Sequence, residues 1–376
     1  MMNKQTQVGI TVVEFMVALL LGTLLLGGVL QVYLSTKRTY TVTEGLSRLQ
    51  ENTRNSLEFL AKDIRMAGYV PCGQATQITS VVATDGDLTP LWLGLFDTPV
   101  LGFEGGVSAF PTELPNAGNA VGERIANSDA LVVLRSGANV ASVALHDVPN
   151  NQIILQRDMG ANWVDDGSLM TICNATNAAL FQAGVISDDA SGTTISLNTS
   201  GVAPGNCTDA LGSPAPITCI GNQTGNNYTF GDDSLISDYK AVAYYVRVSP
   251  NGDGSSLYRE YLRVENDAGT PTAKTVSEEI LEGVESMQVQ YGVDTSGNDG
   301  VANQYFDADQ ITTAQWGSVV TIRVGLLMTS PNGVNQNVDT RIYNIAGTQI
   351  GPGGDFNYAQ DTRARYATNL TISLRN

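Results

Sequence analysis

Histidine is almost absent from this sequence, since His146 is the single one among 376 residues. Cysteine is also scarce: there are four, and no two of them form a C-x-x-C pair. Zinc-finger spacing and two-histidine metal sites are therefore excluded, and a catalytic triad would depend on His146. His146 stands in "SVALHDV", which we interpret as an exposed strand position, and no carboxylate spacing selects a pair for glycoside cleavage. We therefore expect a protein that is not an enzyme.

Basic residues are few as well: 20 Lys and Arg stand against 37 Asp and Glu, which gives a net charge of −17. The charge is unevenly distributed along the chain: residues 1–70 have a net charge of +2, and the remaining residues have a net charge of −19. An acidic body repels phosphate backbones, so the sequence argues against DNA or RNA binding. The same charge favours solubility of an exported body.

Charge is missing altogether between Phe15 and Thr36. That run exceeds the roughly 20 residues needed to cross a bilayer and predicts a membrane-spanning helix. A secretory signal peptide has a shorter apolar region, of about 7–15 residues, followed by a small-residue cleavage site that this sequence lacks. Glu14 lies at the start of the apolar run, where a carboxylate costs about 2.5–3.5 kcal/mol, so we expect it to be functional. The alternative is a plain signal anchor in which Glu14 is tolerated by snorkelling.

The residues around Glu14 form a motif. A short polar leader that carries Lys4 is followed by Gly9 and then "ITVVE". This resembles the class III signal of type IV prepilins and pseudopilins, although Ile10 stands where phenylalanine or methionine is commoner. The resemblance implies cleavage after Gly9 by the prepilin peptidase and methylation of Ile10 at the new N-terminus. It also implies that Glu14 is an assembly carboxylate, which pairs with the N-terminal amine of a neighbouring subunit.

A helical pattern continues beyond the membrane segment. Apolar and small residues recur at steps of three and four, namely Leu46, Leu49, Thr53, Leu57, Leu60, Ile64 and Ala67. No proline occurs before Pro71, and Gly68 suits the position just after a helix end. We therefore expect one helix from Ile10 to about Ala67, roughly 85 Å long.

After Gly68 the sequence changes to short β-like runs between turn-forming residues. The strands that we expect are Ala130–Arg135, Gln152–Gln156, Leu169–Cys173, Thr193–Leu197, Met287–Val293, Val319–Met328 and Tyr366–Leu374. "AVAYYVRVSPNGDGSSLYREYLRV" predicts a hairpin, whereas residues 174–227 are rich in small polar residues and predict long loops. The fold class expected is α+β, with a leader at 1–9, a helix at 10–67 and a β-rich head at 68–376.

Several blocks in this body carry a second resemblance. They are "DIRMAGYVPCG", "SLMTICNATNAALFQAG", "LYRE", "EEILEGVESMQVQYGVDTSGNDGVANQYFDAD", "WGSVVTIRVGLLMTS" and "DTRARYATNLTISLRN". These blocks resemble the PilW family of type IV pilus minor pilins. The resemblance implies a type IV pilin fold, in which the outer half of the helix packs on an antiparallel sheet, with an enlarged loop-rich body.

The cysteines Cys72, Cys173, Cys207 and Cys219 are even in number. In an exported body this predicts two disulfides, for which three connectivities are possible. We expect Cys72–Cys173 and Cys207–Cys219, because the second pair closes a short loop, "CTDALGSPAPITC", that is rich in turn formers. The alternative is four reduced, buried thiols.

One loop, "DTSGNDGVANQYFDAD", could supply oxygen ligands to calcium. Its candidate ligands are Asp294, Asn298, Asp299, Asp307 and Asp309. An EF-hand register fails, because Asp299 falls where the required glycine would stand if Asp294 came first. A solvated hairpin turn explains the same residues, and we expect no cofactor.

The family resemblance implies a minor pilin that acts by assembly. Its expected partners are other minor pilins, the major pilin, the prepilin peptidase and a tip adhesin. The protein would begin in the inner membrane with a periplasmic body and end in the extracellular pilus, at its tip, where it would support adhesion or motility. The alternatives are a type II secretion pseudopilin and a membrane-anchored module that binds or cleaves surface glycans.

Overall fold

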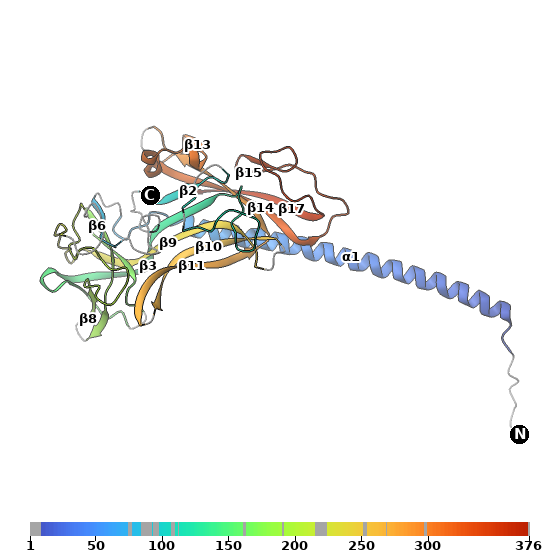
Figure 1. Cartoon of the computed structure of the whole chain (residues 1–376), viewed down its shortest axis with the longest axis horizontal. Coiled ribbons are helices and arrows are strands. Elements are labelled where there is room, and N and C mark those ends of the chain that lie inside the picture. The colour runs from blue at the N-terminus through green and yellow to red at the C-terminus, as the bar shows by residue number, and fades with distance from the viewer. Residues whose placement is uncertain are drawn as a thin grey trace, which may run out of the picture.

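The computed structural model shows one long helix that projects from a β-rich body (Figure 1). It describes residues 9–73, 77–83, 92, 98–106, 110–111, 113–160, 163–189, 192–214, 224–250, 254–267, 269–296 and 299–374. Residues 1–8, which include most of the expected leader, lie outside this set. The architecture is α+β, as the sequence predicts.

The helix α1 is continuous from Val12 to Arg65. Its first half is exposed on all sides, whereas its second half packs on the body. The helix ends where the sequence predicts, because Gly68 adopts a φ of 71° and donates its N–H to the Leu134 carbonyl at 2.9 Å. A left-handed residue at this position favours glycine and reverses the chain into the body.

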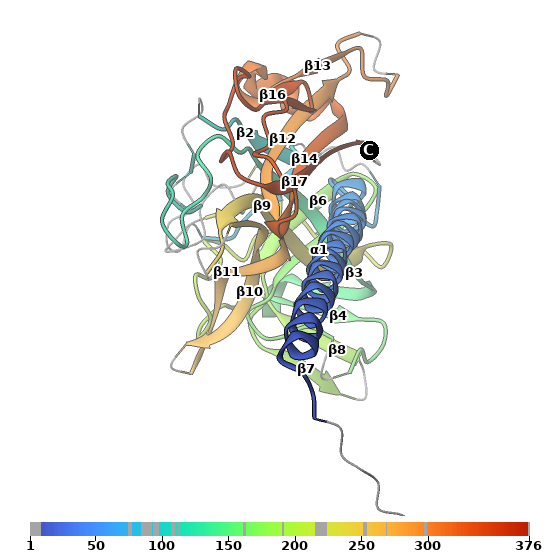
Figure 2. The ribbon, with the colours of Figure 1, turned by 90° about the vertical axis from the view of Figure 1, so that its right-hand side faces the viewer.

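The buried face of α1 follows the expected periodicity. It comprises Gly45, Leu49, Thr53, Ser56, Leu60, Ala61, Asp63 and Ile64. Leu46, which belongs to the same pattern in the sequence, is 41% exposed instead. The head therefore begins to cover the helix only near Gly45, and Figure 2 shows α1 along one flank of the body, beside β17 and β3.

The body contains a large sheet and a small one in the described part of the chain. The large sheet has the order β1-β6-β5-β9-β3-β4-β8-β7; in addition β10 pairs with β9, β11 pairs with β10, and β2 pairs with β3. Its strands are β1 (Gln77–Ser80), β2 (Val100–Phe103), β3 (Ala130–Asp147), β4 (Gln152–Leu155), β5 (Leu169–Cys173), β6 (Asn177–Gln182), β7 (Ile186–Asp189), β8 (Gly192–Ser196), β9 (Leu235–Val248), β10 (Ser255–Asp267) and β11 (Thr270–Glu282). All pairs are antiparallel except β1–β6.

The small sheet is antiparallel and has the order β13-β12-β14-β17. Its strands are β13 (Gln304–Phe306), β12 (Val284–Val293), β14 (Val319–Gly333) and β17 (Arg363–Ser373), and a separate ribbon pairs β15 (Tyr343–Ile345) with β16 (Thr348–Ile350). Three short 3₁₀ helices, η1 (Val148–Asn150), η2 (Ala308–Gln310) and η3 (Thr313–Ser318), complete the described elements.

One hydrophobic core joins α1 to both sheets. Leu60 and Ile64 of α1 are fully buried in it, together with Tyr244 of β9, Tyr291 of β12 and Leu326 of β14. Truncating a buried aliphatic side chain to alanine typically costs about 2–5 kcal/mol, so this cluster fixes the helix on the head. A second core, around Ile153 and Phe181, lies under the part of the large sheet that α1 does not reach.

Most expected strands are confirmed, and β5 has the predicted bounds. The hairpin forms from β9 and β10, although β3 and β14 are longer than their predicted segments. The prediction of long loops over residues 174–227 is wrong in part, because β6 and β7 lie there. All six residues of β6 are buried, so this strand lacks the apolar–polar alternation that reveals a half-exposed strand.

Candidate assembly site at the helix N-terminus

Glu14 and Thr11 form a reciprocal cap at the start of α1. The Glu14 N–H donates to Thr11 Oγ1 at 3.3 Å, and Glu14 Oε2 accepts from the Thr11 N–H at 3.1 Å and from its hydroxyl at 3.0 Å. Gly9 and Ile10 precede this cap and are exposed, with Ile10 79% accessible. The position that the signal motif marks for cleavage is therefore adjacent to the helix start.

This cap gives the Glu14 carboxylate partners within its own chain. It is a capping box, which satisfies helix N–H groups that have no partner in the helix itself. The signal for it is present in the sequence as Thr-x-x-Glu just before an apolar run, although we did not predict the cap from it. Any carboxylate–amine contact with another subunit must compete with these local bonds.

The apolar part of α1 continues directly from the capped end. Exposed large hydrophobic residues follow one another around the helix, namely Val12, Val13, Phe15, Met16, Val17, Leu19, Leu20, Leu21, Leu24, Leu25, Leu26, Val29, Leu30, Val32, Tyr33 and Leu34. Among the described residues, α1 is the one helix that is long and apolar enough to cross a membrane. Its composition fits a membrane anchor, in which an all-round apolar surface faces lipid.

At the other end of α1, a buried polar network attaches the helix to the head. Asp63 accepts from Arg135 of β3 at 2.9 Å and from the Tyr244 hydroxyl of β9 at 2.6 Å. Burial and the nearby Asp63 carboxylate raise the pKa of Tyr244, so this hydroxyl stays protonated and donates. Breaking a buried ion pair leaves an uncompensated charge, so the network holds α1 and the large sheet in one arrangement.

One of the two predicted disulfides is present among the described residues. Cys72 and Cys173 form a disulfide with a Cα–Cα distance of 5.9 Å, which ties the segment after α1 to β5. Cys207 is also disulfide-bonded. Its predicted partner Cys219 lies outside the described residues, so the Cys207–Cys219 pair stays a prediction.

The calcium candidates are not gathered into a site in the described part of the chain. Asp294 accepts from the N–H groups of Ser296 and Gly300 at 3.2 and 3.0 Å, as a turn carboxylate does. Each of the other candidates has its own surroundings: Asp299 accepts from the Val301 N–H, Asp307 accepts from the Gln290 amide, Asp309 lies in η2, and Asn298 lies outside the described residues. No group of three or more His, Cys, Asp and Glu side chains that could hold a metal ion occurs among the described residues.

His146 is not at an exposed position, so that prediction is wrong. The side chain is buried, and its Nδ1 accepts from the Phe230 N–H at 3.2 Å while the ring packs near that of Phe230. Burial lowers the pKa of His146, which keeps the imidazole neutral and able to accept this bond. The alternation in "SVALHDV" did not reveal its burial, because a distant loop covers this side of β3.

Two further carboxyl groups, unmarked by any sequence motif, meet where β2 approaches β3. The register pairs Phe103 with Ala130, so Glu104, directly after β2, lies beside Asp129, directly before β3. Asp129 is buried and accepts from the N–H groups of Gly105 and Val289 at 2.8 and 2.7 Å. Burial, with the nearby carboxylates of Asp307 and Asp309, raises the pKa of Glu104 to about 7. These groups join the two sheets.

Comparison with known proteins identifies the C-terminal part of the chain. Residues 243–376 match the model of the PilW family, described as Type IV Pilus-assembly protein W. The matched region runs from within β9 to the end of the chain and includes the whole small sheet that packs on α1. Searches of curated proteins and of solved structures found no match. The chain thus joins an apolar N-terminal helix to a C-terminal region that matches the PilW family of type IV pilus assembly.

Proposed function

We propose that this protein is a minor pilin, which joins other minor pilins to prime assembly of the type IV pilus. The observation that carries the proposal is the position of Gly9, Ile10 and Glu14 at the capped start of an exposed apolar helix, in a chain whose C-terminal region matches the PilW family. The protein acts by assembly and not by catalysis. Packing of the second half of α1 on the small sheet supports this proposal, since a pilin-like arrangement requires it.

Cleavage after Gly9 creates a new amine at Ile10, next to the Glu14 cap. A carboxylate in an apolar environment is stabilised by a cation, and an amine on an adjacent subunit at the same membrane depth supplies one. The Thr11–Glu14 cap keeps the carboxylate satisfied until then. Assembly therefore exchanges local hydrogen bonds for an ion pair between subunits.

The localisation follows from this mechanism. The apolar half of α1 anchors the protein in the inner membrane, with the body in the periplasm, until the protein enters the pilus. The large body suits the pilus tip, because a terminal subunit has free space around its head. There it would contact other minor pilins and the major pilin, could present an adhesin, and would support adhesion or motility.

The first test is chemical. Intact-mass measurement of protein extracted from membranes of a host with the prepilin peptidase should show the loss of residues 1–9 and a methyl group on Ile10. As a control, Gly9→Leu should block cleavage without altering the fold, since Gly9 is exposed and no atom lies within 4 Å of its position for a side chain. A wild-type chain that still begins at Met1 or Met2 would contradict the proposal.

The second test is genetic and separates the two assembly systems that use such signals. Deleting the gene should reduce the number of surface pili, and the full chain should restore them. Normal piliation with a loss of protein secretion would instead identify a type II secretion pseudopilin.

A further inference from the structure

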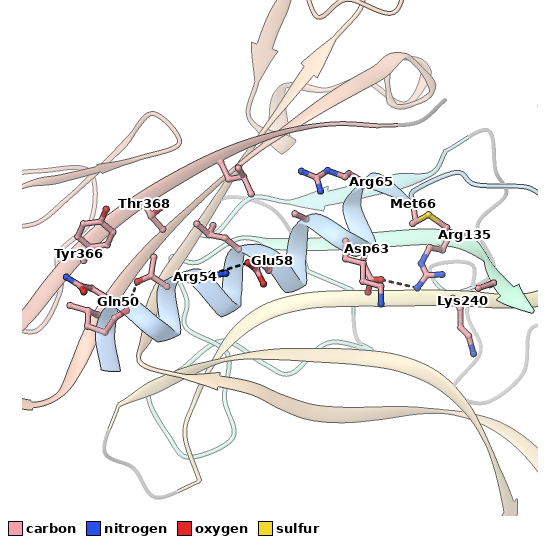
Figure 3. A pocket seen from close by; sticks show the side chains of 18 of the residues that line it. Gln50, Arg54, Glu58, Asp63, Arg65, Met66, Arg135, Lys240, Tyr366 and Thr368 are labelled. Atoms are coloured by element: carbon pink, nitrogen blue, oxygen red, sulfur yellow. Dashed lines mark hydrogen bonds and ion pairs between the residues drawn. The ribbon is translucent and has the colours of Figure 1, made fainter. Parts of the chain in front are cut away.

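A groove runs along the second half of α1, beside strand β17 (Figure 3). Its volume is about 1240 Å³. The α1 side is lined by residues from Leu46 to Met66, and β17 contributes Tyr366, Thr368 and Leu370; Arg135 and residues 137–139 of β3 and Asp238 and Lys240 of β9 also line the groove. The groove is long and mainly apolar, which suits an extended polypeptide better than a small molecule.

The edge of the small sheet opens onto this groove. Within the described residues β17 is the last strand of its sheet and pairs only with β14, on one side. An open edge presents N–H and C=O groups that can pair with another strand, and proteins usually protect such edges with charged residues or proline. The segment from Tyr366 to Ile372, "YATNLTI", contains neither a charged residue nor a proline. It is an unprotected template for strand addition.

Apolar residues of α1 form the floor of the groove, where the side chains of an added strand would pack. Such a strand would lie about 4.8 Å from β17, and alternate side chains would point toward α1. There Leu46 is 41% exposed and Leu57 is half-buried, although both belong to the apolar pattern of the helix. An added strand with apolar residues at alternate positions would cover this flank.

Basic residues in the groove wall indicate that the bound strand carries negative charge at one end. Arg54 is paired with Glu58, and Lys240 with Asp238, but Lys62 and Arg65 are exposed in the groove wall and make no ion pair in the described part of the chain. Unpaired cations at one end of an apolar groove complement carboxylates on a partner.

Symmetric pairing with a second copy does not fit the membrane. Tyr366 lies beside Gln50, and Thr368 lies further along toward Arg65, so β17 and α1 run side by side in the same direction (Figure 3). Antiparallel pairing of two β17 edges about a two-fold axis would direct the two apolar helix halves in opposite directions. One membrane cannot hold both, so the occupant belongs to a different protein.

We propose that the groove receives an extended strand from a different pilus subunit, which adds to the free edge of β17 and becomes the fifth strand of the small sheet. Its alternate apolar side chains cover Leu46 and Leu57, and a carboxylate near one end pairs with Lys62 and Arg65. This inference rests on the proposed function, because it requires a partner in the same membrane. In this proposal, β17 as well as the apolar half of α1 contacts other pilus subunits.

The test uses the full chain, co-expressed with each prepilin-like subunit encoded beside it and purified from membranes in detergent. In the complex, backbone amides of the outer edge between Tyr366 and Ile372 should exchange hydrogen at least about tenfold more slowly than in the free chain. The double variant Lys62→Glu/Arg65→Glu should bind its partner about tenfold more weakly. The matched control is Arg48→Glu, an exposed α1 cation outside the groove, which should bind like wild type.

The outcomes separate this inference from the proposed function. A complex in which the β17 amides exchange as in the free chain would overturn the inference and leave the proposed function intact. Protection of α1 without β17, which indicates a docked helix, or a second copy of this chain as occupant would also overturn it. If no prepilin-like subunit forms a complex, both the proposed function and the inference fail.

Discussion

At the scale of single residues, the carboxyl groups of Asp129 and Glu104 differ in the hydrogen bonds that they receive. Asp129 receives two backbone N–H groups, whereas Glu104 has one buried oxygen without a hydrogen-bond partner in the described part of the chain. Burial raises the pKa of both groups; the carboxylates of Asp307 and Asp309 add to the effect on Glu104, whose pKa reaches about 7, and the Glu104 carboxylate adds to that on Asp129. Both carboxyl groups are therefore easier to bury when they are protonated.

A pH dependence follows. The stability that protonated Glu104 provides is fully present below its unfolded pKa, near 4.5, and is lost as the pH rises through about 7. Glu104→Gln should therefore match wild type near pH 5 and exceed it by about 1–2 kcal/mol at pH 8, less than the full shift implies because the side chain is partly exposed. Thermal or denaturant unfolding of the full chain in detergent measures the difference. Equal unfolding free energies of the two proteins at both pH values would refute this explanation.

At the scale of elements, the sequence predicts α1 better than it predicts the body. The helix is determined within one local segment, by regularly spaced apolar residues, by the absence of proline before Pro71 and by a glycine at the helix end. β6 and the burial of His146 depend on partners far away in the chain, and β11 was not predicted although it pairs with β10 over its full length. The Thr11–Glu14 cap was predictable, since its motif is local.

The junction between α1 and the large sheet gives a prediction at this scale. Asp63→Ala leaves Arg135 half-buried without its carboxylate and should lower the free energy of unfolding by about 3 kcal/mol. The control is Glu58→Ala, which removes the exposed Arg54–Glu58 pair and should cost less than about 0.5 kcal/mol. Denaturant unfolding followed by circular dichroism compares the two, and equal effects would show that the buried network contributes no more than a surface pair.

At the scale of the whole molecule, the two ends of α1 serve different tasks. The outer end is attached to the head by Leu60, Ile64 and the Asp63 network, and the membrane end exposes an apolar surface that the protein itself does not cover. Such a surface has to be covered by lipid or by other helices. The charge follows the same division, because residues 1–70 carry a net charge of +2 and the rest of the chain carries −19.

The role of Glu14 in assembly can be tested most directly. Glu14→Ala removes both the cap and the carboxylate, whereas Thr11→Ala weakens the cap but keeps the carboxylate, so the pair of variants separates the two roles. We expect Glu14→Ala to be made, cleaved and folded but to co-purify with other minor pilins at least about a hundredfold less, since a broken buried pair costs about 3–5 kcal/mol. Thr11→Ala should co-purify like wild type. If Glu14→Ala bound its partners and supported piliation normally, Glu14 would be only a helix cap, and assembly through a Glu14–amine pair would be wrong.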